Sequence, residues 1–138
     1  MAVVVLDEPV SLPRYGTLPN QGVVDSLPMG TDLSIVGYGV QKVRNIGPHD
    51  VFVRELAHTL LVASNDVLAP NFIKMTANPA KNKGAICFGD SGGPDLLAGT
   101  DTAVAINTFV TNPNCAGVAY SQRLDRSAIL AFIQSFMT

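Results

Sequence analysis

Charged residues and tryptophan are scarce in this chain. Tryptophan is absent, and charged residues make up 14% of the 138 residues, against about 25% in ordinary soluble domains. Nine basic and eleven acidic residues give a net charge of −2. The chain therefore lacks the positive excess that binds nucleic acid, and its charge gives no reason to expect a membrane partner. Its apolar runs, such as residues 2–6 and 60–63, are far too short to cross a bilayer.

Metal-binding and secretion signals are missing as well. No Cys-x-x-Cys, His-x-His or His-Glu-x-x-His pattern occurs, so no metal and no other cofactor is expected. The segment after Met1 has no basic region, long apolar region or small-residue cleavage site, so no signal peptide is predicted. The two cysteines, Cys87 and Cys115, leave two alternatives open. They either form a disulfide, which would close a loop of about 29 residues and stabilise the fold by about 3 kcal/mol, or remain free thiols.

Apolar residues and turn formers are abundant. Hydrophobic residues make up 47% of the chain, with 12 glycines and 9 prolines, which favours short strands and turns within one domain. Residues 3–6 are predicted to form a buried strand, and further strands are predicted at residues 33–40, 51–63 and 102–110. One helix is predicted from the apolar spacing of residues 129–137, with Asp125 as its N-cap. These elements predict a β-barrel or sandwich with a helical tail.

The stretch from Cys87 to Pro94 reads Cys-Phe-Gly-Asp-Ser-Gly-Gly-Pro. A serine between glycines can occupy a sharp loop whose backbone N–H groups turn inward together. Converging donors of this kind stabilise an oxyanion, and the hydroxyl of Ser91 beside them is a candidate nucleophile. The neighbouring Asp90 is expected to be buried, and a buried carboxylate needs a cationic partner.

Two other interpretations of this stretch compete with a catalytic one. A glycine-rich turn without chemistry is the simplest of them. Residues 89–93 also match the Gly-x-Ser-x-Gly elbow of α/β-hydrolases. That elbow requires a helix directly after the serine, and residues 92–99 leave little room for one.

The same stretch resembles the active-serine motif of the chymotrypsin- and trypsin-like serine proteases, Cys-x-Gly-Asp-Ser-Gly-Gly-Pro, at every fixed position. Residues 36–39 look like that family's Ser-Gly-Trp-Gly segment and residues 107–110 like its Val-Ser-Trp-Gly strand. Residues 115–124 resemble the closing wall of its specificity pocket. The resemblance covers nearly the whole chain and implies an all-β fold. That fold is a single antiparallel Greek-key β-barrel with a C-terminal α-helix, the C-terminal lobe of a two-barrel protease.

The resemblance implies a role for each residue of the motif. Ser91 would be the nucleophile, and the backbone N–H groups of Gly89 and Ser91 would form the oxyanion hole. Asp90 would pair with the freed amino terminus of the processed enzyme. Cys87 and Cys115 fall where the family has a disulfide that braces the specificity pocket.

The resemblance also implies a pocket for a peptide or protein substrate. Ala85 would form its floor, where alanine offers no charge to select arginine or lysine. Val110 would stand where a glycine leaves the pocket open, so its side chain should narrow the entrance. Thr108 and Phe109 would lie beside the substrate and Gly117 in the closing wall. We therefore expect a preference for small or medium apolar side chains.

The family's catalytic histidine and its orienting aspartate have no counterpart in this sequence. His49 and His58 match no family position, and each is predicted to be a surface or structural histidine. We expect residues 1–28 to be an inter-barrel connection with its leading strand, and residues 29–138 to be the C-terminal barrel and terminal helix. The chain would then be a truncated, nearly inactive copy of a secreted endopeptidase whose N-terminal barrel is missing. A genuine short product that works as a non-catalytic binding lobe is the alternative.

Overall fold

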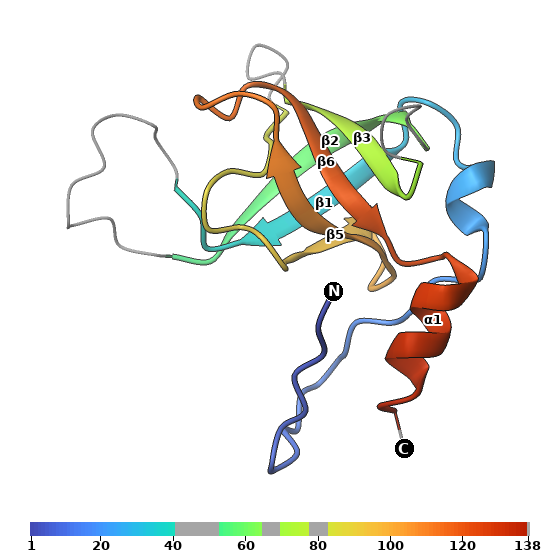
Figure 1. Ribbon diagram of the computed structural model, residues 1–138. Helices are drawn as coiled ribbons and strands as arrows, with labels where there is room; N and C mark the ends of the chain where they lie inside the picture. Colours follow the sequence, from blue (N-terminus) through green and yellow to red (C-terminus); the bar gives the residue numbers. More distant parts are fainter. Residues whose placement is uncertain (41–52, 65–69, 78–82, 138) are drawn as a thin grey trace.

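The computed structural model describes residues 1–40, 53–64, 70–77 and 83–137. Six strands in these residues form one closed antiparallel barrel in the order β1-β2-β3-β6-β5-β4 (Figure 1). A short 3-10 helix, η1 (Val23–Ser26), precedes the barrel, and the helix α1 (Ser127–Gln134) follows it. The predicted fold class, an antiparallel barrel with a C-terminal helix, is confirmed. The strands are β1 (Asp32–Gly37), β2 (Glu55–Ala63), β3 (Phe72–Ala77), β4 (Pro94–Leu97), β5 (Ala103–Val110) and β6 (Gly117–Arg123).

The strand order explains how the serine motif meets the barrel wall. β1, β2 and β3 are neighbours in chain order, whereas β4 crosses over to pair with β1 and β5. Every described strand therefore has a neighbour on both sides, which is the Greek-key closure that protects sheet edges. β4 begins at Pro94, directly after the serine motif. A strand rather than a helix follows Ser91, which argues against an α/β-hydrolase elbow.

One hydrophobic core fills the barrel. In β1 and β3 the core residues lie two positions apart, because successive side chains of a strand point to opposite faces. In β5 the consecutive residues Val104 and Ala105 are both buried. Val24 of η1 and Ile86, which precedes the serine motif, close the core from outside the sheet. The core consists of Val24, Leu33, Ile35, Leu61, Ile73, Met75, Ile86, Val104, Ala105 and Ala119.

Three of the four strands that the apolar pattern predicted are found, and three others are added. β1 and β5 lie within the predicted ranges 33–40 and 102–110 to within one residue. β2 covers the second half of the predicted strand 51–63, of which residues 51 and 52 lie outside the described residues. β3, β4 and β6 had no predicted range. β6 places the polar residues Ser121 and Arg123 on its buried face, so its apolar pattern is weak.

The N-terminal segment differs from the buried strand expected there. Residues 3–6 belong to no strand, and Val4, Val5 and Leu6 are 83%, 66% and 61% exposed. In Figure 1 this segment (blue) extends away from the barrel. An apolar extended segment becomes a strand only where a neighbour satisfies its backbone hydrogen bonds, and none of the described strands does so.

The C-terminal helix begins and packs differently from its prediction. Arg126 occupies the N-cap position without a side-chain hydrogen bond, whereas Asp125, the predicted cap, is buried below the helix. Leu130 is the buried residue of α1. Phe132 and Phe136 contact each other edge to face and are 39% and 44% exposed. Neither described helix is long and apolar enough to cross a membrane.

A buried arginine joins the end of the barrel to the segments around it. Arg123, the last residue of β6, is fully buried and donates hydrogen bonds to the Asp125 carboxylate at 2.8 and 2.7 Å. It also donates to Asp25 at 2.6 Å and to the Ser64 carbonyl at 2.9 Å. Its hydrogen bond lowers the pKa of Asp25. Asp125 in turn accepts the Val24 N–H at 2.9 Å, so one network fixes η1, the end of β2 and the approach to α1.

We predict that Arg123→Met destabilises the chain by about 3–5 kcal/mol, because it leaves the buried Asp125 carboxylate without its cation. Urea unfolding followed by circular dichroism measures the loss. Arg14→Met is the matched control, since Arg14 pairs with Asp101 at a site where the two side chains are 73% and 40% exposed. Its loss should stay below about 1 kcal/mol. Equal losses in the two variants would contradict the structural role of the network.

Candidate active site

The serine loop, residues 87–94, connects the core residue Ile86 to β4. Gly89 and Gly92, which lie around Ser91, have φ angles of +97° and +89°. Residues with a Cβ rarely adopt such angles, so only glycine lets the chain turn on both sides of the serine. The glycine spacing of the motif therefore dictates the local shape of the loop.

Ser91 is exposed at the surface of this loop. Its Oγ donates a hydrogen bond to the Thr108 carbonyl of β5 at 3.4 Å. The backbone N–H groups of Gly89 and Ser91 donate no hydrogen bond to any other described residue. Unpaired backbone donors beside an exposed hydroxyl are what an oxyanion site requires.

Backbone hydrogen bonds hold the serine loop against β5. The Gly92 N–H donates to the Asn107 carbonyl at 2.9 Å, and the Asn107 N–H donates to the Gly93 carbonyl at 2.9 Å. A Cβ on Gly93 would lie 2.4 Å from the Val36 carbonyl oxygen of β1, so this glycine allows the loop to approach the barrel wall. The serine loop thus packs against both β5 and β1.

Asp90 has backbone partners where a cation was predicted. Its carboxylate, half-buried, accepts the Gly39 N–H at 2.7 Å and the Cys87 N–H at 2.8 Å. No cation pairs with it among the described residues. Cβ atoms on Gly37 and Gly39 would lie 1.9 and 2.5 Å from atoms of this carboxylate. The two glycines therefore make room for Asp90 beside β1.

The disulfide that the resemblance implied is confirmed. Cys87 and Cys115, 28 positions apart in the sequence, are bonded, and the bond links the serine loop to the segment before β6. This segment is shaped by its own polar contacts, since the Ala116 N–H donates to the side-chain oxygens of Asn112 and Asn114, each at 3.1 Å. The disulfide ties two loops that carry predicted site residues.

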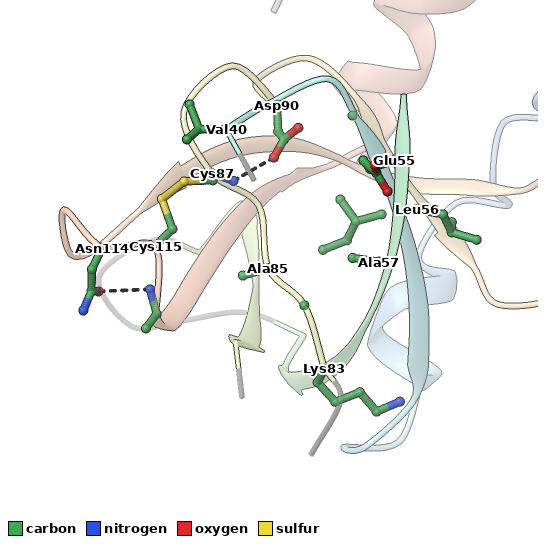
Figure 2. A pocket seen from close by; sticks show the side chains of 14 residues that line it. Val40, Glu55, Leu56, Ala57, Lys83, Ala85, Cys87, Asp90, Asn114 and Cys115 are labelled. Atoms are coloured by element: carbon green, nitrogen blue, oxygen red, sulfur yellow. Dashed lines mark hydrogen bonds between the residues drawn. A yellow bond between two sulfur atoms is a disulfide. The ribbon is translucent and has the colours of Figure 1, made fainter. Parts of the chain in front are cut away.

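A pocket of about 290 Å³ lies beside the serine loop (Figure 2). Four of the predicted site residues line it, namely Ala85, Cys87, Asp90 and Cys115. In Figure 2 the Asp90 carboxylate stands at one end of the pocket and Lys83 at the other. Lys83 forms an ion pair with Asp32 of β1, so its charge is already partnered.

Part of the pocket wall comes from residues that the sequence did not indicate. Residues 55–57 of β2 line the pocket, opposite β1 residues with which they pair in the register Gly37↔Glu55 to Ile35↔Ala57. Gly84 also lines it, and a Cβ there would lie 2.5 Å from the Ala57 Cβ. No motif marks these positions, because they reach the pocket only through strand pairing.

The remaining predicted substrate residues lie on β5 and β6 and are not among the lining residues of this pocket. Phe109 is 41% exposed and stacks on Tyr120 with ring centroids 4.8 Å apart. Val110 packs against the hydrophobic core, and Gly117 begins β6. Thr108 meets the site through its carbonyl, which accepts the Ser91 hydroxyl. The structure thus divides the predicted substrate residues between the pocket and the β5–β6 wall.

The histidines show no catalytic arrangement within the described residues. His58 is exposed on β2, and its Nδ1 lies 3.4 Å from the Ser34 Oγ. It makes no hydrogen bond to Ser91. His49 lies outside the described residues. No group of three or more potential metal-binding side chains gathers in the part of the chain that the structure describes.

A closed antiparallel barrel with a disulfide-linked Gly-Asp-Ser-Gly loop defines a class of protein, the trypsin-like serine proteases. The family model described as Trypsin matches residues 1–128. The chain belongs to the trypsin family. A search of curated proteins found no significant match.

Solved structures support the same fold. A mutant of human heparin binding protein (CAP37) is 21% identical, with a TM-score of 0.74, and the match covers 95% of this chain and 54% of that one. Human heparin binding protein itself is 22% identical, with a TM-score of 0.71 and coverages of 94% and 54%. HL collagenase is 18% identical, with a TM-score of 0.65 and coverages of 87% and 52%. The chain therefore spans about half the length of these structures.

We predict that Gly37→Ala destabilises the chain by about 1–3 kcal/mol, because the new Cβ overlaps the Asp90 carboxylate and displaces it from its two N–H donors. Thermal unfolding followed by circular dichroism measures the effect. In the control, Gly16→Ala, the new Cβ would lie 3.7 Å from the Asp101 carbonyl oxygen, an ordinary van der Waals distance. A Gly37→Ala variant as stable as this control would show that Asp90 does not depend on the space beside β1.

Proposed function

We propose that this chain is the serine-bearing half of a trypsin-like endopeptidase. Ser91 Oγ attacks the carbonyl carbon of the scissile peptide bond, and the N–H groups of Gly89 and Ser91 hold the resulting oxyanion. The amine then leaves, and water hydrolyses the acyl-enzyme. The supporting observation is the exposed Ser91 hydroxyl next to the backbone N–H groups of Gly89 and Ser91, which have no partner among the described residues, in a chain of the trypsin family.

The general base would come from outside these residues. A serine hydroxyl is a weak nucleophile until a base takes its proton. The sequence holds two histidines, of which the described one, His58, neighbours Ser34 rather than Ser91. We propose that an N-terminal barrel supplies the histidine and the orienting aspartate. The 54% coverage of the related structures accords with such a second half.

The exposed N-terminal segment would connect the two halves. In this proposal residues 1–28 form the inter-barrel connection and residues 29–138 the C-terminal barrel with its helix. The later part of the connection is fixed to the barrel, since Thr17 bridges to Thr102 and Val24 lies in the core. The earlier part exposes a row of apolar side chains, which the N-terminal barrel would cover.

The end of the pocket at Asp90 would receive the new amino terminus of the processed enzyme. Asp90 lines this pocket with a half-buried carboxylate. An ammonium group entering there would form a charge-assisted hydrogen bond with it. Docking of the terminus would then order the serine loop, because Asp90 directly precedes Ser91.

The substrate would be a peptide or protein with a small or medium apolar side chain before the cleaved bond. Ala85 brings no charge to the site, and Val110 adds bulk to the wall beside it. The reaction requires no metal or other cofactor. A secreted protein fits the disulfide, which persists in oxidising compartments. The heparin binding named for the related human protein is not proposed for this chain, because a net charge of −2 offers no attraction for a polyanion.

We predict that the 138-residue chain reacts with a fluorophosphonate at least about 100-fold more slowly than an intact trypsin-like protease, because it lacks the general base. Mass spectrometry of the labelled serine measures the rate, with Ser91→Ala as the control.

The longer product encoded in frame upstream should contain a Thr-Ala-Ala-His-Cys-like segment and label Ser91 rapidly. Rapid labelling of the chain alone would contradict the missing base, and an upstream stop codon would support the non-catalytic alternative.

For that longer protein, we predict that peptides with alanine or valine before the scissile bond have a higher kcat/KM than matched peptides with arginine. The physical reason is that Ala85 leaves a guanidinium without a counter-charge in a partly desolvated site. Ala85→Asp is the informative variant, since it should shift the preference towards arginine. Faster cleavage of arginine substrates by the unchanged protein would refute the assignment of Ala85.

A further inference from the structure

Three buried polar side chains face the interior of the barrel near the serine loop. Asp95 of β4 is 0% exposed, Asn107 of β5 is 2% exposed and Ser121 of β6 is 0% exposed. Asp95 pairs with Ala105, and Asn107, two positions further along β5, pairs with Ser121. Because side chains alternate along a strand, these three lie on the same inner face. We call them the inner polar cluster.

The inner polar cluster is unusual because none of its polar side-chain atoms has a hydrogen-bond partner among the described residues. Both carboxyl oxygens of Asp95, both amide atoms of Asn107 and the Ser121 Oγ make no hydrogen bond within the described residues. Burial raises the pKa of Asp95 to about 7, and the neighbouring Ser121 hydroxyl partly opposes this rise. A protonated carboxyl can donate a hydrogen bond to an amide or hydroxyl oxygen, whereas an ionised one would be a buried charge.

No described cation is available to neutralise Asp95. Arg123 also faces inward on β6, but its guanidinium binds Asp125 and Asp25. Asp90, on the serine loop, accepts two backbone N–H groups. Burial therefore favours the protonated form of Asp95 over the ionised form. The other described titratable groups on the barrel strands are exposed or half-buried: Asp32 on β1, Glu55 and His58 on β2, Lys74 on β3 and Tyr120 on β6.

The cluster is joined to the serine loop through the backbone of Asn107. That residue makes two backbone hydrogen bonds with the loop, one with Gly92 and one with Gly93. β4, which carries Asp95, begins where the loop ends. A change in the pairing of β4 with β5 at Asp95 therefore reaches the serine loop by two routes, through Asn107 on β5 and through the start of β4.

We propose that Asp95 is a positioning residue for Ser91, which holds the serine loop on β5 only while its carboxyl carries a proton. In the protonated state the carboxyl donates to the Asn107 or Ser121 oxygen and closes the inner polar cluster. Loss of the proton leaves a charge without a partner, which draws water between β4 and β5 and loosens the hydrogen bonds of Gly92 and Gly93. The effect of this step on catalysis rests on the proposed function of Ser91, whereas the coupling between Asp95 and the serine loop does not.

The test is a pH titration of the ¹⁵N-labelled chain by NMR. The amide signals of Gly92, Gly93 and Asn107 should shift together in one transition with a midpoint near pH 7. Asp95→Asn, which keeps the shape of the side chain without its charge, should abolish that transition. The control is Asp101→Asn, because Asp101 is a surface carboxylate paired with Arg14, and it should leave the transition unchanged.

A second measurement, urea unfolding as a function of pH, tests the proposal even where Asp95→Asn folds poorly. The unfolded chain releases the Asp95 proton near pH 3.8, whereas the folded chain keeps it to about pH 7. The urea midpoint of the unchanged chain should therefore fall as the pH rises through this window, and the extra slope should vanish in Asp95→Asn and in Asp95→Leu.

Two results would overturn the proposal: a transition at Gly92 and Gly93 that persists in Asp95→Asn, or none in the unchanged chain. Failure of Ser91 to label in the longer protein would count against the proposed function alone, because the amide titration needs no catalysis.

Discussion

β4 is short, yet its pairing with β1 on one side and β5 on the other closes the barrel. Because the serine loop leads directly into this strand, the loop has to pack against β1 and β5 at the position where β4 closes the barrel. That constraint explains its glycines, which supply positive φ angles and let Gly93 approach the Val36 carbonyl. It also explains why Asn107 holds the loop by two backbone hydrogen bonds. The candidate nucleophile is therefore positioned by strand pairing.

A chain with few charges places several polar groups inside, and each is accommodated in a different way. Arg123 donates four hydrogen bonds, to Asp125, Asp25 and the Ser64 carbonyl, so its burial ties η1, β2 and the approach to α1 together. Asp90 is stabilised by two backbone N–H groups in a space that two glycines provide. Asp95 has neither an ion-pair partner nor a backbone N–H donor among the described residues.

Membership of the trypsin family and the barrel geometry explain different parts of the site. The family accounts for the serine loop, its disulfide and the closed barrel. The geometry shows how the surface is divided: one pocket lies between the serine loop, β1 and β2, and the Phe109–Tyr120 stack lies on the β5–β6 wall. The apolar N-terminal segment is exposed outside both regions.

The sequence by itself determined the features that depend on local conformation and spacing. The motif predicted the turn around Ser91, apolar patterns predicted β1, β2 and β5, and the family resemblance predicted the barrel and the disulfide. Tertiary structure alone decided that Asp90 binds backbone N–H groups, that Asp125 pairs with Arg123 instead of capping α1, and that β2 lines the pocket. It also brought Asp95, Asn107 and Ser121 onto one inner face. These features follow from the register between strands distant in sequence, and a register is set by the packing of the whole barrel rather than by any local pattern.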